Sequence, residues 1–180
     1  MRASKTNPAA VPAALKEQAA QLPFKAQSIS VLVFTLDTHL PFCEIAEHLA
    51  EQFTELELTA QVGMAGPQRV KSVLEGKFTG VDVLVVVGDT SSESEDRLME
   101  LVEWLLANGR RDLAENLIYA VLGHEYQNHA TSAFSRVVLP RSYYARTQQS
   151  GLKLPWAASA RESWELANAV VDYAFGLGAE

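Results

Sequence analysis

Two hydrophobic patterns alternate along most of the chain. Short apolar runs rich in β-branched residues are typical of buried strands, whereas apolar residues three or four positions apart are typical of one helix face. The runs predict five strands, at residues 29–34, 56–62, 81–87, 117–122 and 136–144. The helical spacings predict helices at residues 40–53, 67–74, 91–105 and 160–175.

The third run, residues 81–87, is apolar at every position except Asp82. Such a strand is expected where helices cover both faces of a parallel sheet. Together with the alternation of strands and helices, it predicts an α/β fold: a three-layer α/β/α sandwich around a doubly wound, parallel five-stranded sheet. The short connection before the last strand leaves open whether it holds a helix.

Residues 1–27 form a different kind of segment. Pro8, Pro12 and Pro23 interrupt an alanine-rich stretch, which leaves room for one short helix at about residues 13–21. We expect a partly disordered N-terminal arm, followed by one folded domain over residues 28–180.

Composition restricts the class of protein. The chain has 180 residues, is 48% hydrophobic and carries a formal net charge of -7, values typical of one soluble domain. The single cysteine, Cys43, excludes a disulfide framework and favours the reducing cytoplasm. No apolar run reaches the roughly 18 residues of a membrane span, no secretory leader is visible, and the acidic balance argues against nucleic acid.

Charge is divided unevenly along the sequence. Residues 81–125 hold ten acidic and three basic residues, a net of -7, whereas residues 126–161 hold no acid. The excess of bases in residues 126–161 predicts a surface that docks an acidic protein or a second copy of the chain, or that holds an anionic dinucleotide. An ordinary solvated loop explains any one of its bases equally well. The bases are Arg136, Arg141, Arg146, Lys153 and Arg161.

Three loops are candidates for a site. Ligands of open parallel sheets bind beyond the carboxyl ends of the strands, where the winding reverses. The loops that follow the first, third and fourth strands, residues 35–41, 88–94 and 123–131, therefore deserve comparison with known ligand loops.

Two segments resemble flavodoxin-like proteins, which include flavodoxin domains and NAD(P)H-dependent FMN reductases. They are residues 81–105, with Glu103-Trp104-Leu105, and residues 112–123, and the resemblance extends over about residues 29–175. It implies an FMN-binding oxidoreductase that passes electrons from NAD(P)H to flavin or a small acceptor. It also implies FMN contacts from three groups of residues: Thr35, Thr38 and His39 at the phosphate, Thr90, Ser91 and Ser92 at the ring edge, and His124, Tyr126 and Asn128 across from it.

The first loop departs from that family's phosphate loop. It has two hydroxyls and no glycine, Pro41 lacks an N–H donor, and Asp37 repels a phosphate unless it points away. The alternative hypothesis is therefore a non-catalytic flavodoxin-like interaction or assembly subunit that lacks FMN. Ser91 and Ser92 have a second interpretation as the capped start of an acidic helix.

Other chemistries lack the required spacing. His124 and His129 are five residues apart, which is not the i, i+4 pair of a helical metal site, so we expect no metal. Cys43 has no assignable base. Asp37 and Asp89 follow strands as the acids of receiver domains do, but Leu139-Pro140-Arg141 stands where that family has a lysine.

Overall fold

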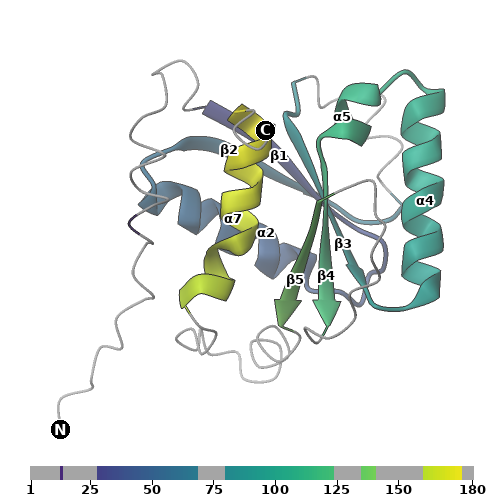
Figure 1. Ribbon diagram of the computed structural model, residues 1–180, viewed down its shortest axis with the longest axis horizontal. Coiled ribbons are helices and arrows are strands. Elements are labelled where there is room, and N and C mark those ends of the chain that lie inside the picture. Colours follow the sequence, from purple (N-terminus) through teal and green to yellow (C-terminus); the bar gives the residue numbers. More distant parts are fainter. Residues whose placement is uncertain (1–12, 14–27, 69–79, 124–134, 141–159, 176–180) are drawn as a thin grey trace, which may run out of the picture.

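The computed structural model describes residue 13 and residues 28–68, 80–123, 135–140 and 160–175 (Figure 1). Its strands are β1 (Ser28–Thr35), β2 (Thr59–Ala65), β3 (Val83–Asp89), β4 (Leu117–Gly123) and β5 (Ser135–Pro140). Its helices are α2 (Phe42–Glu55), α4 (Ser92–Ala107), α5 (Arg111–Glu115) and α7 (Ala160–Phe175). Among these helices, none has the length and apolar content that crossing a bilayer requires.

The five strands form one sheet in the order β2-β1-β3-β4-β5, and every neighbouring pair is parallel. Helices α2 and α7 cover one face, and α4 and α5 cover the other (Figure 1). The predicted three-layer sandwich is confirmed, and the strand order is that of flavodoxin-like domains.

The core has one half on each side of the sheet. In β3, Val83, Val85 and Val87 face the α2 and α7 layer, whereas Leu84 and Val86 face α4. All five side chains are at most 1% exposed. This two-sided burial is why the run is apolar at successive positions instead of alternating with polar residues.

The predicted start of the second strand at residue 56 is wrong. Leu56 caps the C-terminus of α2, Glu57 has a left-handed backbone with φ 59°, and the Leu58 N–H donates to the Phe53 carbonyl at 3.0 Å. Leu56 and Leu58 are buried because they close the end of the helix against the core. Their apolar character belongs to this turn, and β2 begins at Thr59.

Other boundaries shift by a few residues. The first helix begins at Phe42, with Pro41 as its N-cap residue, and β3 extends to Asp89 because Asp89 still pairs with Leu122. Helix α4 is followed by Gly109 with φ 73°, the left-handed conformation that favours glycine. The sequence patterns did not predict α5, which is only five residues long.

Several predictions fall outside the described residues. Pro67 and Gln68 lie in a turn, not in a helix, and residues 69–74 of that expected helix are not described. The same holds for residues 141–144 of the last expected strand, for the N-terminal arm except Ala13, and for the connection between β4 and β5.

Candidate functional site

The candidate site is the carboxyl edge of the sheet between β1 and β3. The chain winds from β1 outward to β2 and then back to β3, so the loops that follow β1 and β3 separate in opposite directions at this point. The Leu36 N–H donates to the Val87 carbonyl at 3.0 Å and holds the start of the first loop against β3.

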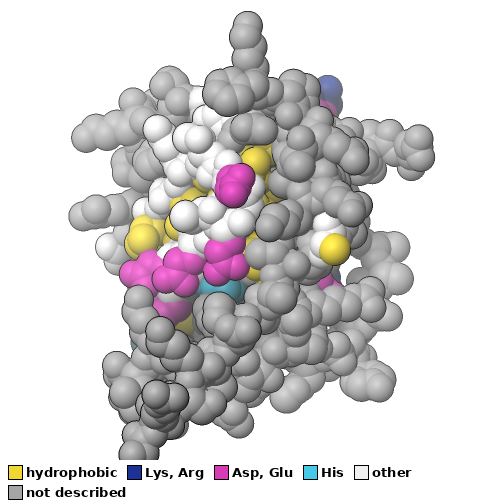
Figure 2. Space-filling model, turned by 90° about the vertical axis from the view of Figure 1, so that its left-hand side faces the viewer, with side chains coloured by type: hydrophobic (Ala, Val, Ile, Leu, Met, Phe, Trp, Pro, Cys, Tyr) yellow, Lys and Arg dark blue, Asp and Glu magenta, His cyan; other side chains and the backbone are white. Residues whose placement is uncertain are grey.

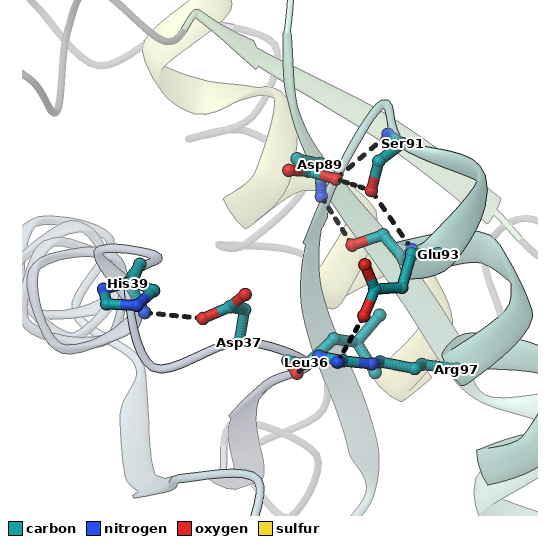
Figure 3. Close-up of polar contacts among 8 residues, drawn as sticks. Leu36, Asp37, His39, Asp89, Ser91, Glu93 and Arg97 are labelled. Carbon is teal, nitrogen blue, oxygen red and sulfur yellow. Dashed lines mark hydrogen bonds and ion pairs between the residues drawn. The ribbon is translucent and has the colours of Figure 1, made fainter.

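The first loop is closed by its own polar groups. The Thr35 side chain is fully buried, and its hydroxyl donates to the Asp37 carbonyl and accepts the Asp37 N–H at 3.1 Å. The Asp37 carboxylate accepts the His39 N–H at 2.9 Å (Figure 3). The Asp37 carboxylate thus accepts the hydrogen bond that this N–H would otherwise donate to a bound anion.

The remaining amides of this loop also have partners. The Leu40 N–H donates to the Asp37 carbonyl at 3.2 Å, the Phe42 N–H donates to the Leu40 carbonyl at 2.9 Å, and Pro41 has no N–H. From residue 36 to residue 42, Thr38 holds the one backbone N–H without a hydrogen bond to another described residue.

The loop after β3 is closed in the same way. The Asp89 carboxylate accepts the Ser91 N–H at 3.0 Å and the Ser91 hydroxyl (Figure 3). Ser91 accepts the Ser94 N–H at 3.2 Å as the N-cap of α4, and the Ser94 hydroxyl accepts the Asp89 N–H. The capping interpretation of this segment is confirmed for Ser91.

Arg97 joins α4 to the first loop. Its Nη1 donates to the Leu36 carbonyl at 3.1 Å, and its Nη2 forms an ion pair with Glu93, one turn earlier (Figure 3). Both contacts join the Arg97 guanidinium to groups of the protein itself. One of these groups, the Glu93 carboxylate, carries the opposite charge and offsets that of Arg97.

Tyr119 supports the loop after β3 from beneath. Its hydroxyl donates to the Asp89 carbonyl at 3.0 Å, and its ring lies so close to Gly88 that a Cβ there would be 2.4 Å from Oη. Burial raises the pKa of Tyr119 to about 12. The phenol therefore stays protonated, and keeps donating, to a higher pH than an exposed tyrosine would.

Arg136 is used inside the molecule. Its guanidinium lies 5.7 Å from the centroid of the Tyr119 ring, and Nη2 is 3.4 Å from the Glu95 carboxylate. The side chain is 18% exposed. The first base of the predicted docking segment therefore offers no free cation; of the other four, no side chain lies in the described part.

A cavity of about 430 Å³ adjoins the first loop, between α4 and the carboxyl ends of β1 and β2. Its walls are partly apolar, and the rest is lined by Pro67 and by three polar side chains, Gln68, Arg97 and Glu100. It lies on the α4 side of the sheet, and two of its lining residues, Leu36 and Arg97, are joined by the hydrogen bond described above.

The structure brings six of the nine predicted site residues to one edge. Thr38, His39, Thr90, Ser91 and Ser92 are exposed there, whereas Thr35 is buried. A Cβ built at Gly123 would lie 2.6 Å from Thr90 Cγ2, so Thr90 lies against the end of β4. His124, Tyr126 and Asn128 lie outside the described residues.

Three residues of this edge were not predicted: Ser94, Arg97 and Tyr119. Arg97 had one visible signal, its position four residues after Glu93, which favours a helical ion pair. Ser94 and Tyr119 had none, since their partners belong to the turn at Asp89 and depend on how β3 and β4 pair.

The donor set does not fit the FMN phosphate. A dianion needs several free N–H or cationic donors. In the first loop every backbone N–H except that of Thr38 has a partner among the described residues, and the Arg97 guanidinium beside the loop is paired with Glu93. Within the described residues, no three His, Cys, Asp or Glu side chains are grouped to hold a metal ion. Burial, with Glu44 and Glu47, raises the pKa of the Cys43 thiol, which disfavours its nucleophilic form.

The chain matches no protein-family model, and no curated protein or solved structure is significantly similar to it. The fold class therefore stands on the strand order and the layers alone. A fold shared by many functions does not assign one, so the function has to be argued from the residues of the site.

Proposed function

We propose that this protein is a non-catalytic binding module, an α/β domain that acts by contacting another protein and not by flavin chemistry. One observation carries the proposal: apart from the Thr38 N–H, the amides of the first loop donate to Thr35, to Asp37 and to backbone carbonyls. The FMN-dependent oxidoreductase is the competing hypothesis, and it requires these same amides.

Opening the first loop to a phosphate costs free energy. Each intramolecular hydrogen bond that is broken costs about 1 kcal/mol, and more where the abandoned group is buried, as Thr35 is. Asp37 and Asp89 would then face the incoming phosphate across a partly desolvated edge, where like charges repel more strongly than in water. Both terms oppose FMN binding.

The test is a titration of the full-length protein with FMN, followed by flavin fluorescence. We expect no saturable quenching and no oxidation of NADPH in the presence of FMN. Micromolar or tighter FMN binding would overturn the proposal.

A variant makes that test specific to the loop. Asp37→Ala removes the carboxylate that takes the His39 N–H. If FMN does use this loop, Asp37→Ala should strengthen binding, and a Thr38→Ala/His39→Ala double variant should weaken it. If neither change alters the titration, the loop takes no part in it.

A further inference from the structure

We propose that the outer edge of β2 binds an extended, basic segment of a partner protein as an additional strand. The inference rests on the proposed function and names the surface and the partner's chemistry. Strand β2 ends the sheet order, all seven of its residues pair with β1, and no described strand lies on its other side. The backbone groups on that side are a template for an added strand.

The two edges of the sheet differ in their protection. Natural edge strands avoid unwanted pairing through charged side chains, prolines or bulges. Strand β5, at the opposite edge, ends at Pro140. Strand β2 has the sequence TAQVGMA, with no charge, proline or bulge, and its Met64 is 45% exposed. Among the described residues, β2 therefore has none of these protections and no strand on its outer side.

Charge selects the partner. Residues 28–68 contain six acidic residues and no lysine or arginine. Four of the acids belong to α2, which packs against β2, and Glu57 lies in the turn between the two elements. In Figure 2, among the side chains that are coloured, acidic ones gather beside a strip of hydrophobic and uncharged atoms, and the basic ones in view lie at the upper margin. A basic segment is complementary to this surface.

The same charges disfavour a second copy of this chain. A two-fold pairing of β2 with itself would bring two acidic α2 helices to the same seam. Ala60 and Val62 pack toward the α2 layer, so alternate residues of an added strand would lie on that side. Lysine or arginine at those alternate positions would meet the glutamates, while the backbone supplies the pairing.

The probe is an N-acetylated, fluorescein-labelled peptide of alternating valine and lysine, as long as β2, titrated into the full-length protein and followed by anisotropy. We expect saturable binding that weakens as salt is added. A peptide of the same charge with two central prolines, which cannot donate to an edge, should bind at least about tenfold more weakly. Equal binding of the two peptides would overturn the inference.

The protein variants form a matched pair. Met64→Lys places a cation at an exposed position of β2, on the same face as Ala60 and Val62, and Met99→Lys does the same on α4, where Met99 is 48% exposed. Met64→Lys should weaken peptide binding by about tenfold or more, and Met99→Lys should change it little. Equal effects of the two variants would overturn the assignment to β2.

Other occupants give distinct results. Sedimentation that shows a dimer of the wild type, lost in Met64→Lys, would assign the edge to a second copy. Binding of a synthetic peptide of residues 1–27, which carry four bases and one acid, in preference to the probe would assign it to the chain's own segment. Either result overturns the inference but leaves the proposed function standing, whereas FMN binding overturns the proposed function itself.

Discussion

Gly88 and Tyr119 form a contact that neither residue's own sequence neighbourhood specifies. They lie on adjacent strands, and the Tyr119 ring crosses the space where a side chain at position 88 would stand. The ring in turn carries the hydroxyl that holds the Asp89 carbonyl. The shape of the loop after β3 therefore depends on a missing Cβ in one strand and a large side chain in the next.

Gly88→Ala should lower the free energy of unfolding by about 1–3 kcal/mol, because an overpacked core forces side chains and backbone to shift. Urea denaturation measures the change. Gly66→Ala is the control, since nothing lies within 4 Å of the Cβ that it adds. Similar losses in both variants would show that the Tyr119 contact is not the cause.

The raised pKa of Tyr119 gives a pH dependence at alkaline pH. Because the folded pKa is about 12 and the ordinary value is 10.0, the unfolded chain loses this proton first. Its contribution to stability is present in full below pH 10 and should be lost between about pH 10 and 12. Urea denaturation across that range should show a smaller decline for Tyr119→Phe than for the wild type. Equal declines would contradict this role.

Among the helices, α4 shows which of two adjacent serines acts as the N-cap. Ser91 and Ser92 are adjacent and both exposed, and the sequence offered either hydroxyl as a cap. Only Ser91 has the extended backbone of an N-cap residue, with its hydroxyl on the Ser94 N–H. The Asp89 carboxylate then binds Ser91, so the cap and the loop form one hydrogen-bonded unit.

Ser91→Ala should destabilise the protein by about 1 kcal/mol through loss of the cap. Ser92→Ala removes an exposed hydroxyl for which the described structure shows no hydrogen bond, and it should change stability by no more than about 0.5 kcal/mol. Thermal unfolding of the two variants beside the wild type provides the measurement. A larger loss for Ser92→Ala would contradict the assigned cap.

At the scale of the whole molecule, the strand order decides which surfaces are available. It places β2 and β5 at the two edges and β1 and β3 side by side, so that the reversal of winding falls between two loops that both carry an aspartate. It also places Arg136 beside Tyr119 and Glu95, which removes that base from the surface. The acidic helix α2 consequently packs beside β2, which ends the sheet among the described strands.

The class of fold follows from local patterns in the sequence. Buried parallel strands need apolar side chains on both faces, and residues 83–87 satisfy this locally, without reference to distant residues. The same holds for the helical stripe of α4 and for the terminating Gly109. The start of β2 was less well predicted. Leu56 and Leu58 are buried at the end of a helix, and buried positions of a strand hold the same apolar residue types.

The hydrogen bonding at the carboxyl edge of the sheet, in contrast, depends on how the whole chain folds. The sequence listed hydroxyls and carboxylates near Thr35, Asp37 and Asp89, but it could not tell whether their hydrogen-bonding groups would face a ligand or one another. In the fold they satisfy the loops' own amides. Hydrogen-bond partners depend on the path of each turn and on strand register, and both are fixed by the packing of the whole sheet rather than by local pattern.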